Sequence, residues 1–231
     1  SASKGIEQKT HLTPSGILGS VLPKGFNERI AIISGPTFAK EVSMGLPSAA
    51  CAAASSIIVA EEVQEVFSTP SFRVYTNTDT IGVELGGAMK NVIAIASGIS
   101  DGLGLGSNAR AALITRGLKE ISVLGSAMGA KEATFYGLSG LGDLVLTCTG
   151  PLSRNYTLGL AIGRGRSLTD ILGEMRMVAE GVKTSIAARE LAEAKGVELP
   201  ITEQVCKVLH EGKSPKQAVM ELMTRGLKHE F

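Results

Sequence analysis

Tryptophan is absent from the 231-residue sequence, aromatic residues make up only 4% of it, and the net charge is close to zero. A formal charge of +1 at pH 7 gives no overall electrostatic attraction to nucleic acid or to an anionic membrane, so we expect no nucleic-acid partner. Cysteine is scarce as well: Cys51, Cys148 and Cys206 are odd in number and form no CxxC pair. The sequence therefore predicts neither a disulfide framework nor a zinc site, and a reducing cytoplasm fits it best.

Long apolar runs are also missing. The most apolar stretches, residues 49–60 and 92–99, are shorter than the roughly 20 residues that a membrane-spanning helix needs. His11, His210 and His229 have no partners at metal-ligand spacing, so we expect no metal site. What is present is an ordinary globular composition, 44% hydrophobic and 19% charged, with ample apolar material for a buried core.

Residues 1–79 alternate short strand-like runs with a helical one. Apolar runs at residues 30–34, 48–54 and 72–76 predict strands. Residues 58–67 have helical spacing, with Glu61 and Glu62 in the early turns. Alternation of this kind favours part of an α/β sheet.

From about residue 80 onward the pattern is helical only. The segment 83–97 is apolar nearly all round, which indicates a central, buried helix. Further helices are predicted at residues 109–127, 156–163, 184–195 and 202–210, and a last one opens at Ser214. We therefore expect an α/β portion, residues 1–79, followed by an all-helical domain, residues 80–231.

Lys90 is the strongest chemical feature of the sequence. It lies inside the apolar segment 83–97, with no acidic residue three or four positions away. Because burial disfavours an ammonium ion, the pKa of Lys90 should fall from its usual value of about 10.4. Such a lysine can exchange a proton near neutral pH. The alternative is a lysine whose head group snorkels to solvent at a helix edge.

A second candidate is the run Ser153, Arg154 and Asn155, which we expect on a loop after Gly150 and Pro151. Arg can hold phosphate oxygens in a bidentate geometry, and its two neighbours add further polar groups, so the run predicts a phosphate clamp. The alternative is a plain helix start, with Ser153 as its N-cap and Arg154 in solvent.

Glycines also occur at positions 137, 140 and 142, directly before Asp143. They let the backbone approach a ligand closely, and Asp143 can accept a hydrogen bond from a hydroxyl group or orient Lys90. No Val/Ile-rich strand precedes these glycines, so we reject a dinucleotide-binding fingerprint here, while a structural turn stays open.

Weaker candidates lie near the expected strand ends and before a late glycine. Lys4, Gly35 and Thr37 each follow an expected strand, and ligands of open α/β sheets collect at the carboxyl ends of strands. Glu180 precedes Gly181, a pattern that more often marks a turn. Each of these signals is weak alone.

Taken in order, these segments resemble the bacterial-type NAD(P)-dependent glycerol-3-phosphate dehydrogenases. The strings that carry the resemblance are residues 2–6, 34–42, 89–94, 140–149, 153–155 and 178–181. Several ordered motifs are far more specific than any one of them, and they span nearly the whole chain. The resemblance implies a remnant of a Rossmann-type α/β domain followed by an all-α domain like the C-terminal domain of 6-phosphogluconate dehydrogenase.

The resemblance also implies a reaction and roles for individual residues. Hydride would pass between a nicotinamide, NAD or NADP, and C2 of a three-carbon phosphate, feeding glycerophospholipid synthesis in a cytoplasmic enzyme that is a homodimer. Lys90 would exchange the proton on the C2 oxygen. The implied substrate-binding positions are Lys4, Gly35, Thr37, Lys90, Asp143, Ser153, Arg154 and Asn155. The implied cofactor-binding positions are Lys4, Ala39, Arg154, Val178 and Glu180.

Two other enzyme classes and one non-catalytic role compete with this interpretation. β-Hydroxyacid dehydrogenases also use a helix-borne lysine, but their pattern places Asn four residues later, where this chain has Ala94. An aldolase would use Lys90 as a Schiff-base nucleophile. A purely structural dimerisation or phosphate-binding module remains the third alternative, although it gains little from burying an amine.

The sequence departs from the family at its start. It does not begin with Met, and it lacks the strand, Gly-rich turn and helix that cradle the cofactor pyrophosphate in this family. We therefore expect residues 1–79 to be the later portion of a dinucleotide-binding domain.

Because that cradle is absent from these 231 residues, we expect the isolated chain to bind NADH or NADPH poorly and to turn over little substrate. A fluorescence titration of either cofactor against the isolated chain checks this, and saturable binding in the micromolar range would contradict it.

Overall fold

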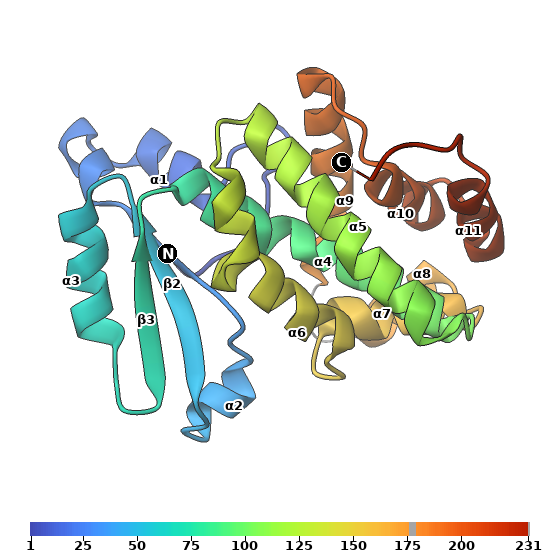
Figure 1. Ribbon diagram of the computed structural model, residues 1–231, viewed down its shortest axis with the longest axis horizontal. Helices are drawn as coiled ribbons and strands as arrows, with labels where there is room; N and C mark the ends of the chain where they lie inside the picture. The colour runs from blue at the N-terminus through green and yellow to red at the C-terminus, as the bar shows by residue number, and fades with distance from the viewer. Residues whose placement is uncertain (176–178, 231) are drawn as a thin grey trace.

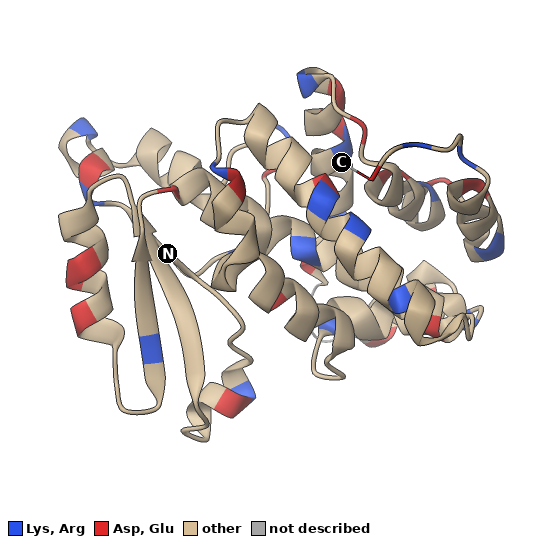
Figure 2. Cartoon of the chain, viewed as in Figure 1, with Lys and Arg blue, Asp and Glu red and all other residues tan. Residues whose placement is uncertain are grey.

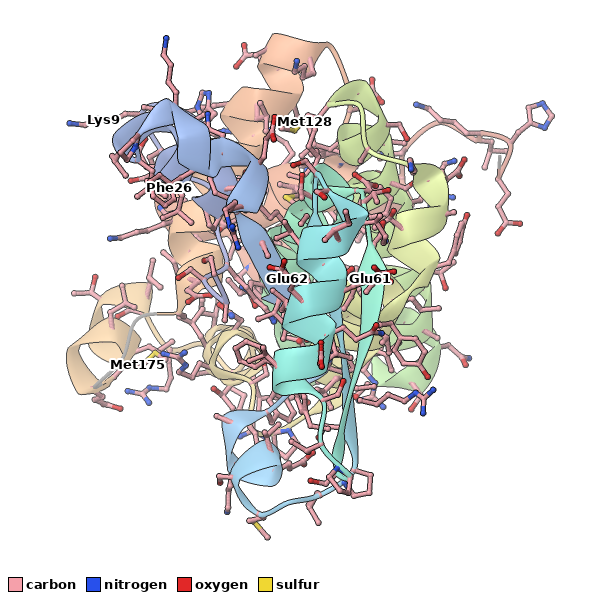
Figure 3. All side chains as sticks on the ribbon, turned by 90° about the vertical axis from the view of Figure 1, so that its left-hand side faces the viewer. Lys9, Phe26, Glu61, Glu62, Met128 and Met175 are labelled. Atoms are coloured by element: carbon pink, nitrogen blue, oxygen red, sulfur yellow. The ribbon has the colours of Figure 1, made fainter. Side chains whose placement is uncertain are left out.

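The computed structural model describes residues 1–175 and 179–230, and it shows an α/β part beside a larger helical part (Figure 1). Strands β1 (Ala31–Ser34), β2 (Ser48–Ala54) and β3 (Phe72–Asn77) form a sheet in that order. β1 pairs antiparallel with β2, and β2 pairs parallel with β3 through the crossover helix α3 (Ile57–Phe67). The strands predicted at residues 30–34, 48–54 and 72–76 are confirmed to within one residue at each end, whereas the strand expected before Lys4 is not present among the described residues. Figure 3 looks onto α3, from which Glu61 and Glu62 project.

The long helix α4 (Thr80–Gly102) is the centre of the helical part. Every residue from 82 to 100 is buried, as the all-round apolar pattern predicted. The helix begins where the Asp79 carboxylate accepts a hydrogen bond from the Gly82 amide at 2.9 Å, which is an N-cap. Around α4 lie α5 (Gly106–Ala127), α6 (Asp143–Thr149), α7 (Arg154–Gly163), α9 (Glu180–Lys195) and α10 (Pro200–His210).

The remaining elements are short. The last helix, α11 (Pro215–Met223), begins as predicted, because the Ser214 hydroxyl accepts from the Gln217 amide at 3.2 Å. Elements that the sequence pattern did not predict are α1 (Pro14–Val21), η1 (Lys24–Arg29), α2 (Ala39–Ser43), η2 (Glu132–Tyr136), the π-helical turn η3 (Leu138–Gly142), α6 and α8 (Leu168–Glu174). Most of them are too short to show a hydrophobic period.

Charges of both signs are distributed over both parts of the molecule (Figure 2). None of the described helices is both long enough and apolar enough to span a bilayer.

Glycine lets α4 and α7 pack with their backbones in close contact. Gly98 of α4 faces the Tyr156 carbonyl, and Gly159 of α7 faces the Ile95 carbonyl. A Cβ atom at either position would meet that carbonyl oxygen, so the helices would have to separate. This contact fixes α7 against the helix that carries Lys90.

Gly159→Ala is therefore expected to lower the free energy of unfolding by about 1–3 kcal/mol, although alanine favours helix formation. Urea denaturation measures the loss. Gly173→Ala in α8 is the matched control, because a Cβ atom added at that position would have no neighbouring atom within 4 Å. Equal unfolding free energies for the two variants would contradict the packing argument.

Candidate active site

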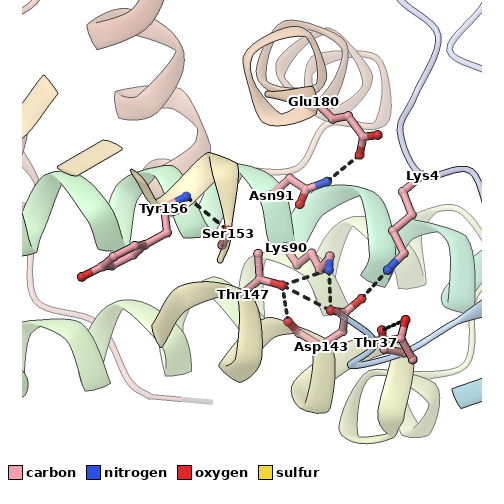
Figure 4. Close-up of polar contacts among 10 residues, drawn as sticks. Lys4, Thr37, Lys90, Asn91, Asp143, Thr147, Ser153, Tyr156 and Glu180 are labelled. Atoms are coloured by element: carbon pink, nitrogen blue, oxygen red, sulfur yellow. Dashed lines mark hydrogen bonds and ion pairs between the residues drawn. The ribbon is translucent and has the colours of Figure 1, made fainter. Parts of the chain in front are cut away.

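The Lys90 ammonium lies in the interior, where two side chains of α6 bind it. The residue is 7% exposed, and its Nζ donates hydrogen bonds to the Thr147 hydroxyl at 2.9 Å and to Asp143 Oδ1 (Figure 4). A snorkelling lysine would instead place Nζ in solvent, so that interpretation is wrong.

Asp143, at the start of α6, joins two lysines that are far apart in the sequence. Its Oδ2 accepts from Lys4 Nζ at 2.7 Å, while Oδ1 binds Lys90. The carboxylate side chain is 2% exposed, and that of Lys4 is 20% exposed. A carboxylate bound by two ammonium groups leaves this cluster with one surplus positive charge, which suits a ligand that is anionic or develops negative charge.

Thr147 is a member of this cluster that the sequence analysis missed. Its hydroxyl donates to the Asp143 carbonyl at 2.6 Å, so a lone pair on the same oxygen accepts from Lys90. The signal was available, because Thr147 follows Asp143 by four residues and so shares its helix face.

Burial dominates the electrostatics of Lys90. Desolvation lowers the pKa of Lys90 from 10.5 to about 8, while the Asp143 carboxylate acts to raise it and the Lys4 charge to lower it. Burial shifts the pKa of Cys148, on the same helix as Asp143, in the opposite direction. It raises the pKa of the thiol to about 12, so the thiol stays protonated. The amine can therefore exchange a proton near neutral pH, and the thiol cannot.

The end of β1 lies next to this cluster. A Cβ atom added to Gly87 of α4 would stand 2.9 Å from Ser34 Oγ and 3.5 Å from Lys4 Cδ. The end of β1, the Lys4 side chain and α4 therefore meet at Gly87. Gly35 follows with φ +159°, where a Cβ would be 2.9 Å from the Ala50 Cα. Thr37 Oγ1 donates to the Gly35 carbonyl at 3.2 Å.

Ala39 is the first residue of α2 and is exposed. Among the described residues, Ala39 makes no hydrogen bond or ion pair with Lys90 or Asp143.

The run at residues 153–155 starts a helix, and the expectation of a loop is wrong for Arg154 and Asn155. Ser153 is the N-cap of α7, its hydroxyl accepting from the Tyr156 amide at 3.2 Å, and Arg154 is exposed. The start of α7 can still bind a phosphate group, because a helix N-terminus itself attracts anions.

The first turns of α7 and α9 meet beside the residue that follows Lys90. Asn155 Oδ1 accepts from the Gly181 amide at 2.9 Å, and Asn91 Nδ2 donates to Glu180 Oε2 at 3.3 Å. Asn91 was not among the predicted site residues, although its adjacency to Lys90 was visible in the sequence. Val178 lies outside the described residues.

One polar atom at this site has no protein partner. Ser34 Oγ is buried and makes no hydrogen bond to any described residue. Buried polar groups are nearly always hydrogen-bonded, so this unsatisfied hydroxyl suits a polar ligand such as a nicotinamide dinucleotide. Within residues 1–175 and 179–230, no group of three His, Cys, Asp or Glu side chains could hold a metal ion.

A separate, mostly apolar cavity of about 600 Å³ lies between α5, α10, α11 and the C-terminal tail. Its lining includes none of the predicted site residues. The buried ion pair of Lys90 and Asp143, rather than hollow volume, therefore identifies the candidate site.

Comparison with known proteins places the chain in one family. Residues 79–220 match the family model described as NAD-dependent glycerol-3-phosphate dehydrogenase C-terminus, and residues 1–60 match the corresponding N-terminus model. The chain is 62% identical over 229 residues to glycerol-3-phosphate dehydrogenase (NAD(P)+) of Geobacter sulfurreducens, covering 99% of this chain and 68% of that protein. It is also 62% identical over 230 residues to the protein of the same name from Citrifermentans bemidjiense, covering 69% of it.

A solved structure leads to the same family. Glycerol-3-phosphate dehydrogenase of Coxiella burnetii superposes with a TM-score of 0.88 at 44% identity, over 97% of this chain and 68% of that one. The enzyme from Saccharomyces cerevisiae superposes with a TM-score of 0.82 at 25% identity.

Asp143→Asn is expected to lower the pKa of Lys90 below its value of about 8, because it removes the carboxylate charge that favours the ammonium form. Carbon-13 NMR titration of the lysine side chains measures this. Asp170→Asn on α8 is the control and should leave the Lys90 titration unchanged. An unchanged or raised pKa in Asp143→Asn would contradict this effect of the carboxylate.

Proposed function

The chain belongs to the NAD-dependent glycerol-3-phosphate dehydrogenase family, and from this premise we propose that it interconverts sn-glycerol 3-phosphate and dihydroxyacetone phosphate with NAD or NADP. The observation that supports this best is the buried cluster of Lys90, Asp143, Lys4 and Thr147. A purely structural helix has no need of an amine held in this way. The proposed physiological direction is reduction of dihydroxyacetone phosphate, which supplies glycerophospholipid synthesis.

Lys90 is the proposed catalytic acid and base. In the reducing direction its ammonium gives a proton to the C2 oxygen as that oxygen gains negative charge, and in the oxidising direction the free amine takes the proton back. A pKa of about 8 leaves both forms populated near neutral pH. Asp143 and Thr147 hold Nζ in one place, and the Lys4 charge beside it stabilises the developing oxyanion.

The substrate phosphate is proposed to bind at the first turn of α7. Arg154 supplies the guanidinium, and the N-terminus of a 10-residue helix adds a favourable dipole. Ser153 and Asn155 fix this turn through their bonds to the Tyr156 and Gly181 amides. Gly35 and Thr37 are proposed to contact the substrate from the end of β1, and Lys4, Lys90 and Asp143 from the buried cluster.

The cofactor is proposed to lie between the end of β1 and the start of α9. Lys4, Ala39, Arg154, Val178 and Glu180 are the proposed contacts. When bound, NAD or NADP supplies or accepts the hydride. The unsatisfied Ser34 hydroxyl, which lies against Gly87 of α4, leaves a polar group on this side of Lys90.

Residues 1–79 are proposed to be the later portion of the dinucleotide-binding domain and residues 80–231 the substrate-binding and catalytic domain. The chain spans 68% of the length of its Geobacter sulfurreducens relative. A homodimer in the cytoplasm is the proposed working state, and the buried free cysteines suit a reducing compartment.

Lys90→Ala, in the protein expressed from its complete gene, is expected to lower kcat for dihydroxyacetone phosphate reduction by about two or more orders of magnitude while the fold stays intact. Steady-state kinetics and circular dichroism measure these two quantities. Lys207→Ala is the control, because that lysine forms an ion pair with Glu203 on α10 and belongs to neither the buried cluster nor the proposed substrate and cofactor contacts.

The pH profile identifies the group. In the unsubstituted enzyme, oxidation of glycerol 3-phosphate should rise as the pH passes through about 8, because the amine form is the base, and reduction should fall over the same range. Near-normal turnover in Lys90→Ala would exclude Lys90 as the proton-transfer residue.

A further inference from the structure

A hydrogen-bonded group of three side chains anchors the first turn of α7 from outside the active site. The Tyr156 hydroxyl donates to Asp101 Oδ2 at 2.7 Å, and Arg110 Nη1 donates to the same oxygen, also at 2.7 Å. Asp101 lies in the last turn of α4, Arg110 near the start of α5, and Tyr156 directly after Asn155. The group therefore joins the ends of three helices.

This group is partly sheltered from solvent. The Asp101 side chain is 13% exposed and that of Arg110 is 32% exposed. Because Arg110 neutralises the Asp101 carboxylate, the anchor adds no net negative charge near the turn that carries Arg154. A hydrogen bond from a neutral hydroxyl to a charged, partly buried acceptor is stronger than a surface ion pair.

Tyr156 does not point into the active site. In Figure 4 its ring extends away from Lys90 and Asp143, while its amide binds the Ser153 hydroxyl. Its backbone thus belongs to the turn that presents Ser153 and Arg154, and its side chain is tied to α4 and α5. The close backbone contact at Gly98 and Gly159 sets the distance between α4 and α7, and the Tyr156 hydroxyl fixes the rotation of α7 at its first turn.

We propose that Tyr156, Asp101 and Arg110 are positioning residues that hold the first turn of α7 in register for the substrate phosphate, and so favour phosphorylated over unphosphorylated three-carbon substrates. This rests on the proposed function. The residues act through the backbone of residues 153–155 and touch neither substrate nor cofactor.

The test compares kcat/KM for dihydroxyacetone phosphate and for dihydroxyacetone, together with the inhibition constant of inorganic phosphate, in the protein from its complete gene. Tyr156→Phe removes only the hydroxyl group. We expect it to raise the KM for dihydroxyacetone phosphate and the phosphate inhibition constant by about fivefold, with kcat within about twofold. The preference for the phosphorylated substrate should fall by the same factor.

Further variants make the result specific. Arg110→Ala should reproduce the effect, and the double variant should be less than additive, because both side chains act through Asp101. Tyr136→Phe is the matched control, since that tyrosine is 61% exposed and lies outside this group. If Tyr156→Phe does not fold, Arg110→Lys tests the same link, because lysine keeps the charge and loses the planar fork.

The outcomes separate this inference from the proposed function. Equal losses for both substrates, or an unchanged phosphate inhibition constant, would mean that the group is merely structural. Absence of dihydroxyacetone phosphate reduction in the unsubstituted enzyme would overturn the proposed function itself. Normal activity in the unsubstituted enzyme, with an unaltered substrate preference in Tyr156→Phe and Arg110→Ala, would overturn only the positioning role.

Discussion

The requirement to neutralise a buried ammonium organises this molecule. Lys90 has no acidic neighbour on its own helix, so the compensating carboxylate must come from elsewhere in the chain, and Asp143 provides it. Without that carboxylate, the Lys90 ammonium would have no charged partner in the interior, and an unpaired buried charge is strongly destabilising. Asp143 also binds Lys4, so one carboxylate ties the start of the chain and the start of α6 to α4. The cluster that the proposed chemistry needs is also a link between the two parts of the fold.

Small residues make this arrangement possible. α4 is in contact with the sheet on one side and with α7 on another, and glycine at positions 87 and 98 removes the side chains that would hold these neighbours away. The same helix carries Lys90 between these two glycines. Close packing on both sides leaves little freedom for the backbone at residue 90, so the amine is held by the helix as well as by its hydrogen bonds.

The sequence predicted the helices and strands whose apolar residues recur with a clear period, but it predicted little of how they pack together. The strands and the long helices were predictable, because alternation and helical spacing are local. Helix α1 was not, since its start is capped by Glu84 of α4, which accepts from the Ser15 amide at 2.7 Å. Thr147 was missed for a similar reason: its role depends on α6 lying beside Lys90, which no local pattern encodes. The antiparallel pairing of β1 with β2 is likewise a tertiary property.

The family motifs indicated Lys90, Asp143 and Arg154 as site residues, whereas composition and spacing alone left a structural alternative for each of them. For Ser153 that alternative is also what the structure shows, because its hydroxyl caps α7. A helix cap and an anion site are compatible, since both use the polarity of a helix N-terminus. The local signal was therefore correct about structure and uninformative about function.

Cys148 has a consequence for chemical resistance. It is fully buried one residue after Thr147, its carbonyl accepts from Ser97, and its thiol stays protonated because burial raises its pKa to about 12. Peroxides and alkylating agents react with thiolates, and this helix offers them none. Oxidative stress that inactivates enzymes with an exposed, acidic thiol would therefore leave Cys148 unmodified.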